Sequence, residues 1–168
     1  MRKRLILTAA TLAAGMASAI TLTVAQADAP TASGTHTDGP AAYKPTGQFT
    51  FVEHAITDTV VDLEPQGDSL GDLLAFANPV FDATDTKQVG SDQGSCVRTA
   101  VGKSWECEWT LLLPAGHLVV QGPYFDTADS VLAITGGTGI WARARGGMVL
   151  HARNAEGTAF DFRYDVTK

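Results

Sequence analysis

The sequence predicts an all-β fold, an antiparallel meander whose strands close into a barrel, and three observations support this. Apolar and polar residues alternate with a period of two in several segments, which is typical of half-buried strands. Turn signals rich in glycine, proline and aspartate recur at short intervals. No window carries a convincing amphipathic helix, apart from a short turn near residues 70–76. A meander of this kind removes its free edges by closing on itself.

Two segments show the alternation most clearly. In residues 160–166 every second residue is apolar, so one face of that strand is hydrophobic. In residues 104–113 the apolar face holds Trp105, Cys107, Trp109, Leu111 and Leu113, while polar residues take most of the other face. The turn signals lie at residues 101–102, 114–116, 126–129, 136–139 and 156–157. Within the fourth of these, Gly136-Gly137-Thr138-Gly139 is expected to be a turn that needs positive φ.

The first 27 residues have the pattern of a signal peptide. Three basic residues at positions 2–4 precede an apolar run to about Ile20, and Ala25-Gln26-Ala27 offers a small-residue cleavage site. The alternative is a membrane anchor, but the Thr and Ser residues of the run and the cleavage site favour a cleaved signal. The protein is therefore expected to be secreted, with no membrane association after cleavage.

The mature chain is expected to be strongly acidic. The full sequence has 12 basic and 18 acidic residues, and loss of the three basic residues in 1–27 leaves 9 against 18, a net charge of −9. Such a charge argues against nucleic acid as a partner. Residues 28–47 are rich in Ala, Thr, Gly and Pro and are expected to form a flexible tether. Residues 48–168 are expected to form one barrel domain.

Three ordered blocks resemble the allene oxide cyclases and, more distantly, the dirigent proteins. The blocks are SLGDLLAFANPVFD at residues 69–82, GSCVRT at 94–99, and VQGPY with LAITGGTGIW within 120–141. The likeness covers roughly residues 50–166. It implies a closed eight-stranded antiparallel β-barrel, which has room inside for side chains or for one small ligand. It also implies homo-oligomers, since family members form trimers.

The two cysteines are expected to form a disulfide. Cys96 and Cys107 flank the turn at Val101-Gly102 symmetrically, so they fall opposite each other in a hairpin, at a separation that a disulfide accepts. Oxidation is expected in an exported protein. A free catalytic thiol is the alternative, because the cyclases carry a cysteine at the Cys96 position. They lack a partner at the Cys107 position, which favours the structural bridge.

Glu53 is the most suggestive polar residue. It lies on the same face of its strand as Phe49 and Phe51, where a carboxylate is costly and burial would raise its pKa. The alternative register faces Val52 inward and leaves Glu53 in water. The resemblance favours the first register, because Val-Glu-His-Ala aligns with the segment in which the cyclases keep a cavity glutamate. Ala55 stands where the cyclases have an asparagine.

The resemblance also implies further site residues. Asn78 falls on the asparagine that holds an ordered water in the family's pocket, although an Asn before a proline is also a common turn residue. Tyr124 corresponds to a pocket aromatic, or else it is a packed tyrosine at a strand end. Leu74, Phe76 and Trp105 correspond to apolar residues that line the cavity, and they are core residues if the barrel is filled.

Two functions follow from these residues. In the first, the barrel cyclises or isomerises a reactive apolar molecule, a fatty-acid epoxide or a polyketide-like compound, by fixing its conformation. Glu53 would stabilise positive charge and Asn78 would hold a water. In the second, the barrel only binds a hydrophobic ligand or guides a coupling reaction, as dirigent proteins do. No cofactor or metal is expected, because the four histidines lack ligand spacing and no phosphate loop or nucleophile elbow is present.

Overall fold

The fold was taken from a computed structural model that describes residues 45–167. The predicted signal peptide and nearly all of the predicted tether lie outside these residues. Nine strands and one short 3-10 helix follow the chain: β1 (Gly47–His54), β2 (Thr59–Val61), β3 (Leu73–Phe81), β4 (Gln88–Ala100), β5 (Ser104–Leu113), β6 (Gly116–Phe125), β7 (Ser130–Gly137), η1 (Gly139–Trp141), β8 (Arg145–Ala152) and β9 (Ala159–Thr167). In this part of the chain no helix is long and apolar enough to cross a membrane.

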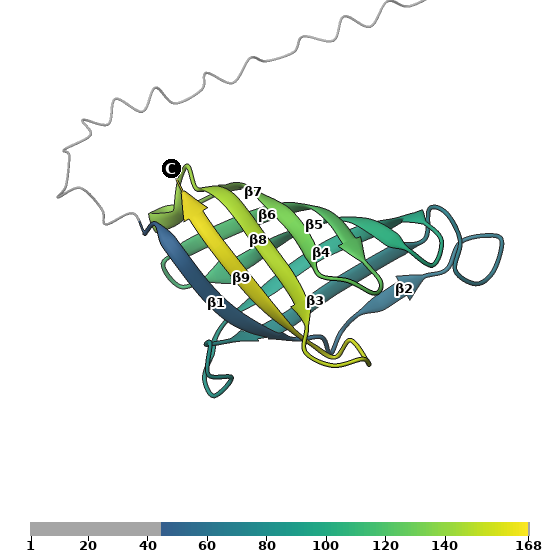
Figure 1. Cartoon of the computed structure of the whole chain (residues 1–168), viewed down its shortest axis with the longest axis horizontal. Coiled ribbons are helices and arrows are strands. Elements are labelled where there is room, and N and C mark those ends of the chain that lie inside the picture. Colours follow the sequence, from purple (N-terminus) through teal and green to yellow (C-terminus); the bar gives the residue numbers. More distant parts are fainter. Residues whose placement is uncertain (1–44, 168) are drawn as a thin grey trace, which may run out of the picture. The chain divides into compact units, whose positions relative to one another are not determined.

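Eight of the strands close into the expected barrel. Strands β3 to β9 form a meander in which each strand pairs antiparallel with the next, and β9 then pairs with β1. Closure comes from β1, which also pairs with β3 through Val52–Phe81 and Glu53–Val80. Figure 1 shows β1, β9, β8 and β7 crossing in front of β3 to β6. The predicted eight-stranded antiparallel barrel is thus confirmed.

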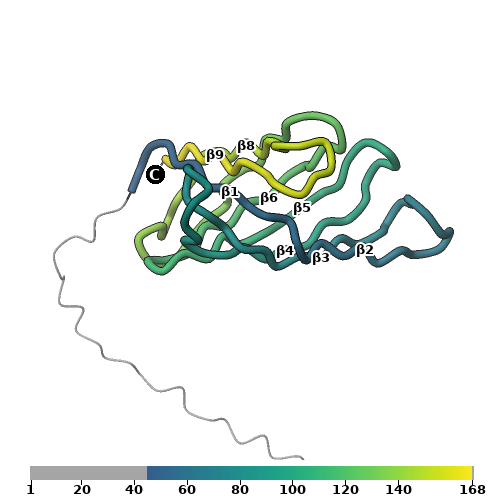
Figure 2. Tube along the Cα trace, turned by 90° about the horizontal axis from the view of Figure 1, so that it is seen from below, coloured from purple at the N-terminus to yellow at the C-terminus, as the bar shows by residue number. Residues whose placement is uncertain are grey.

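The short strand β2 stands outside the closed barrel. It pairs only with the first residues of β3, from Leu73 to Ala75. Both views place it beside β3, at the end away from the C-terminus (Figure 2). The residues near 70–76 therefore form a turn followed by a strand, because Leu73 onward is held by pairing with β2 and β4.

The inward faces of the strands make one core. The apolar residues of β5 and β9 that share a face are buried or partly buried, as the alternation predicts. Tyr164 and Phe162 are the largest fully buried side chains. Aromatic rings fill much of the barrel, and Trp109 packs against Phe76 and Phe162 with ring centroids 6.1 and 5.6 Å apart. Burial of such rings is a dominant stabilising contribution.

The Gly-Gly-Thr-Gly segment does not form the single turn that the sequence predicted. Its first two glycines still belong to β7, and only Gly139 has positive φ, at 59°. Gly137 is needed for close packing instead, because a Cβ there would lie 2.7 Å from the carbonyl oxygen of Trp141. The chain then passes through η1 before β8 begins. The expectation of positive φ was therefore right for one of the three glycines.

The Ser-Leu-Gly-Asp segment belongs to a loop that the Asp72 carboxylate holds in place. The carboxylate of Asp72 accepts hydrogen bonds from the backbone N–H groups of Ser69 (2.8 Å) and Leu63 (2.9 Å) and from the Ser69 hydroxyl (2.9 Å). These backbone donors lower the pKa of Asp72. Gly71, between Ser69 and Asp72, has a φ of 97°, a conformation that favours glycine. Residues 69–72 therefore shape the entry to β3 and lie outside the cavity wall, unlike Leu74 and Phe76 further along the same block.

Cys96 and Cys107 form the predicted disulfide. They are directly opposed in the β4–β5 ladder, with Cα atoms 4.0 Å apart. The β4–β5 register shifts only beyond Arg98, nearer the turn, so the symmetric count from Val101-Gly102 holds at the cysteines. A free catalytic thiol is excluded for both residues, since no cysteine is free. Both line the internal cavity described below.

Removing the disulfide is expected to destabilise the barrel without changing its fold. The double variant Cys96→Ala, Cys107→Ala should lose about 2–3 kcal/mol of unfolding free energy, because an open chain gains more entropy on unfolding than a cross-linked one. Urea unfolding of this variant and of the wild type measures the difference. A loss below about 0.5 kcal/mol would show that closing this short loop with a disulfide contributes little to the stability of the barrel.

Candidate functional site

An internal cavity lies at the end of the barrel where β1, β6 and β8 end and β9 begins. Its volume is about 190 Å³. Most of the wall is apolar and aromatic, with carboxyl groups at a few points. The lining residues are Glu53, Asp58, Leu74, Phe76, Cys96, Cys107, Trp109, Tyr124, Leu150, Glu156, Gly157, Phe160 and Phe162. A concave apolar site with few polar groups is the usual form of a small-molecule site.

Glu53 faces inward, in the register that pairs it with Phe160 of β9 and Val80 of β3. It is 5% exposed, although it belongs to the cavity wall. Phe49 and Phe51 pack on the core from the same face, whereas Ile56 is largely exposed. The alternative is therefore wrong in placing Glu53 in water and Ile56 inside, although Val52 on the opposite face of β1 is buried, as that alternative expected.

Asn78 holds Glu53 in place. Its side-chain N–H groups donate to Glu53 Oε1 and to Asp58 Oδ1, both at 2.7 Å. Its Oδ1 accepts from the backbone N–H groups of Ile56 (3.0 Å) and Thr57 (2.9 Å). Both amide hydrogens are thus used within the protein, and Asn78 lies behind the cavity wall. It therefore positions the acid and has no N–H left for the ordered water that the resemblance implied.

Burial, together with the side chain of Asp92, opposes the ionisation of Glu53. Burial, followed by repulsion from Asp92, raises the pKa of Glu53 to about 9. Burial also raises the pKa of Asp92 to about 7, against hydrogen bonds from the Asn78 backbone N–H and from Glu53. Asp92 is 1% exposed, and its Oδ2 has no hydrogen-bond partner among residues 45–167. Because burial raises the pKa of both carboxyl groups, and that of Glu53 further, Glu53 keeps its proton to a higher pH than Asp92.

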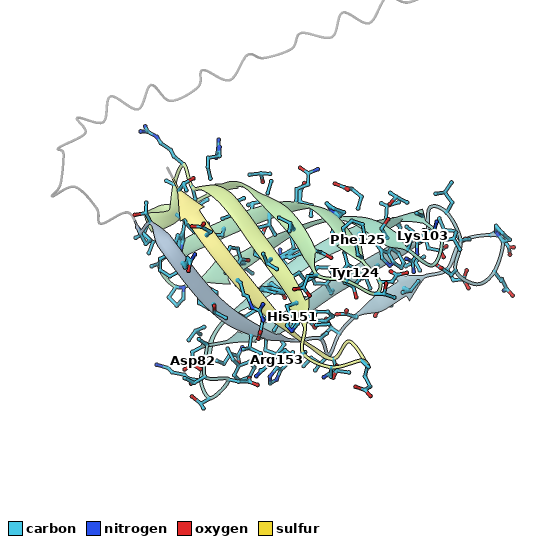
Figure 3. The ribbon with its side chains drawn as sticks, viewed as in Figure 1. Asp82, Lys103, Tyr124, Phe125, His151 and Arg153 are labelled. Atoms are coloured by element: carbon cyan, nitrogen blue, oxygen red, sulfur yellow. A yellow bond between two sulfur atoms is a disulfide. The ribbon has the colours of Figure 1, made fainter. Side chains whose placement is uncertain are left out.

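Four of the predicted pocket residues belong to the lining of the cavity. Glu53, Leu74, Phe76 and Tyr124 all line the cavity. Burial, with repulsion by neighbouring carboxylates, raises the pKa of the Tyr124 hydroxyl, so it stays a neutral hydrogen-bonding group at neutral pH. Figure 3 shows Tyr124 and Phe125 next to each other at the end of β6.

Trp105 lies elsewhere than the sequence suggested. It is buried, but it is outside the cavity lining, and Trp109 stands on the wall instead. The Arg98 guanidinium lies 4.0 Å from the Trp105 ring centroid and is held by Asp126 (2.8 Å) and Asp68 (2.6 Å). Trp105 and Trp109 share one face of β5, so the alternation alone could not decide between them.

Several site residues were missed at the sequence level. Asp58 and Glu156 follow strands in loops, where a carboxylate is unremarkable in sequence. Asp92 offered a signal that could have been used, since it falls in phase with Gly94 and Cys96 on β4, an inward face. Among residues 45–167 no group of three or more His, Cys, Asp or Glu side chains is arranged to hold a metal ion.

These features define a closed antiparallel β-barrel with an acid-bearing internal cavity. The chain belongs to the allene oxide cyclase family, because the model of that family, described as allene oxide cyclase, matches residues 56–154, more than half of the chain. Glu53 lies just before the matched range, whereas Asn78 and Tyr124 lie within it.

Solved structures show the same barrel. A pyocyanin demethylase is 27% identical, with a TM-score of 0.62 over 71% of this chain and 99% of that one. A pterocarpan synthase dirigent protein is 20% identical, with a TM-score of 0.58 over 71% of this chain and 81% of that one. An exo-specific intermolecular Diels-Alderase is 11% identical, with a TM-score of 0.55 over 71% and 97%. The last two likenesses concern the fold alone.

Proposed function

We propose that the barrel cyclises or isomerises a small, reactive, largely apolar molecule in this cavity, with Glu53 as the proton donor. The observation that carries the proposal is a buried carboxyl group held by Asn78 on an otherwise mostly apolar wall, where burial raises its pKa. A buried acid that keeps its proton at neutral pH is suited to general acid catalysis. The family match supports a ring-forming reaction, because the matching model is described as allene oxide cyclase.

The chemistry balances without a co-reactant. For an epoxide, Glu53 gives its proton to the ring oxygen as the C–O bond breaks, and the electron pair of that bond stays on oxygen. A new bond forms within the substrate at the electron-poor carbon, and loss of a substrate proton to the Glu53 carboxylate restores the acid. The aromatic wall holds the substrate in a folded conformation, which lowers the entropic part of the barrier. This role replaces the anionic Glu53 that the resemblance suggested.

A binding protein or a coupling guide without a catalytic residue is the second candidate. The disulfide favours it, because Cys96 and Cys107 on the cavity wall cannot act as nucleophiles. The two candidates differ in one observable. An isomerase converts a bound epoxide into a product of the same mass, whereas a binder returns it unchanged.

Filling the cavity is expected to abolish both binding and conversion. Leu74→Trp places a larger side chain on the cavity wall, whereas Leu73→Trp, on the next residue, is a matched control, since Leu73 is 40% exposed and outside the cavity. Binding of the neutral dye N-phenyl-1-naphthylamine is measured by fluorescence, and conversion of a panel of aryl and alkenyl epoxides by chromatography with mass detection.

We expect Leu74→Trp to weaken dye binding at least about tenfold, since a filled pocket cannot hold the ring. Leu73→Trp should match the wild type within about twofold. Equal binding by both variants would place the ligand outside the cavity. Binding by the wild type without conversion of any epoxide would leave the binder and remove the isomerase.

A further inference from the structure

A second chamber adjoins the acid-bearing cavity. Its volume is about 380 Å³, and it lies between the β6–β7 turn and the β8–β9 loop. The two chambers share five wall residues: Tyr124, Leu150, Glu156, Gly157 and Phe160. We call them the inner cavity, which holds Glu53, and the outer chamber. A ligand longer than the inner cavity would extend past these shared residues into the outer chamber.

The charged residue types that line the two chambers are all acidic. Together their walls carry five carboxyl groups, those of Glu53, Asp58, Asp126, Asp129 and Glu156. No Lys, Arg or His side chain is among the described residues that line either chamber. A ligand carboxylate would therefore enter without a cationic partner, at a cost in desolvation and repulsion.

The carboxylates of the outer chamber differ in how far they are neutralised. Asp126 is paired with Arg98 at 2.8 Å, and Asp129 with His151 at 2.7 Å. Glu156 has no hydrogen bond or ion pair with any side chain in residues 45–167, and it lines both chambers at their junction. Among the carboxylates of the outer chamber, its negative charge is therefore the one that no partner balances.

The aromatic side chains of the outer chamber, like its carboxylates, favour a cationic ligand. Tyr124, Phe125 and Phe160 all line the outer chamber, and Phe125 is 41% exposed, so its ring is accessible there. Aromatic faces attract a cation within about 6 Å of the ring, and carboxylates add to that attraction. Figure 3 shows Tyr124 and Phe125 together at this end of the barrel.

We propose that the ligand of this barrel is a small aromatic molecule with a positively charged nitrogen. Its ring occupies the inner cavity against Phe76 and Trp109, and its charged end lies in the outer chamber beside Glu156. The proposal rests on the proposed function, because both concern the same site. It departs from a fatty-acid epoxide, whose carboxylate would meet carboxyl groups and no cationic side chain on either wall.

Three probes with one ring system test the charge preference at pH 7.5. They are 1-naphthylmethylamine, 1-naphthalenemethanol and 1-naphthoic acid, which are cationic, neutral and anionic, and each is titrated against bound N-phenyl-1-naphthylamine. We expect the amine to bind at least about tenfold tighter than the acid, with the alcohol between them. Raising the salt from 0.05 to 0.5 M should narrow the difference, because the carboxylates are partly exposed.

Two variants test whether Glu156 is the source of the preference for the amine. Glu156→Gln is expected to reduce the advantage of the amine over the acid about threefold or more, while the exposed Glu108→Gln, on the outer face of β5, leaves it unchanged. An acid that binds as tightly as the amine would overturn the charge proposal and leave the proposed function standing. Failure of all three probes, the neutral alcohol included, would overturn the ligand-binding cavity itself and with it both proposals.

Discussion

Glu53→Gln is expected to lower kcat by about 10²–10⁴-fold, the usual contribution of a positioned general acid. Glutamine keeps the shape of the protonated acid and can still accept the hydrogen bond from Asn78, but it has no proton to transfer. Binding of the neutral dye should stay within about twofold of the wild type, so the loss falls on kcat rather than on KM.

The matched control for this variant is Glu106→Gln. Glu106 is exposed on the outer face of β5, away from the cavity, and its replacement should leave kcat unchanged. Full activity of Glu53→Gln on an epoxide that the wild type converts would show that the barrel acts by holding the substrate's conformation alone.

The same substitution is expected to stabilise the barrel at alkaline pH. At pH 8 Glu53→Gln should raise the unfolding free energy by about 4–5 kcal/mol, and at pH 5 by less than about 1 kcal/mol. Urea unfolding at several pH values measures both differences. Equal effects of the substitution at pH 5 and pH 8 would mean that Glu53 has an ordinary pKa in the folded protein.

The direction follows from proton linkage. Burial and Asp92 raise the folded-state pKa of Glu53 from 4.5 to about 9, so the folded protein keeps a proton that the unfolded chain releases. Below the unfolded pKa both states are protonated and Glu53 costs nothing. As the pH rises toward 9, only the unfolded state gains from ionisation, and the barrel loses stability. Asp92, with its pKa raised to about 7, acts in the same direction.

The sequence predicted the barrel well because its determinants are local and repeated. Alternation along β5 and β9 and the symmetric spacing of Cys96 and Cys107 around their turn are set by backbone geometry alone. These features need no knowledge of how distant strands meet. The inward face of Glu53 needed more, because its phase with Phe49 and Phe51 left two registers open and the resemblance to the cyclases decided between them.

The details of the site depended on distant contacts. Whether Trp105 or Trp109 lined the cavity was decided by Arg98, which lies on the neighbouring strand and covers Trp105. The neutral state of Glu53 depends on Asp92, which lies 39 positions later in the numbering and is brought close by closure of β1 onto β3. Neither contact has a signature in the local pattern.

The proposed function requires Glu53 to be a neutral acid on the wall of the cavity at neutral pH. The most direct test is carbon-detected NMR of the glutamate side-chain carboxyl groups through a pH titration, with the Glu53 signal assigned by its absence in Glu53→Gln. We expect this signal to titrate near pH 9, because burial and Asp92 both oppose its ionisation. A signal that titrates near the ordinary value of 4.5 would contradict the account, since Glu53 would then be an anion at neutral pH and could not donate a proton.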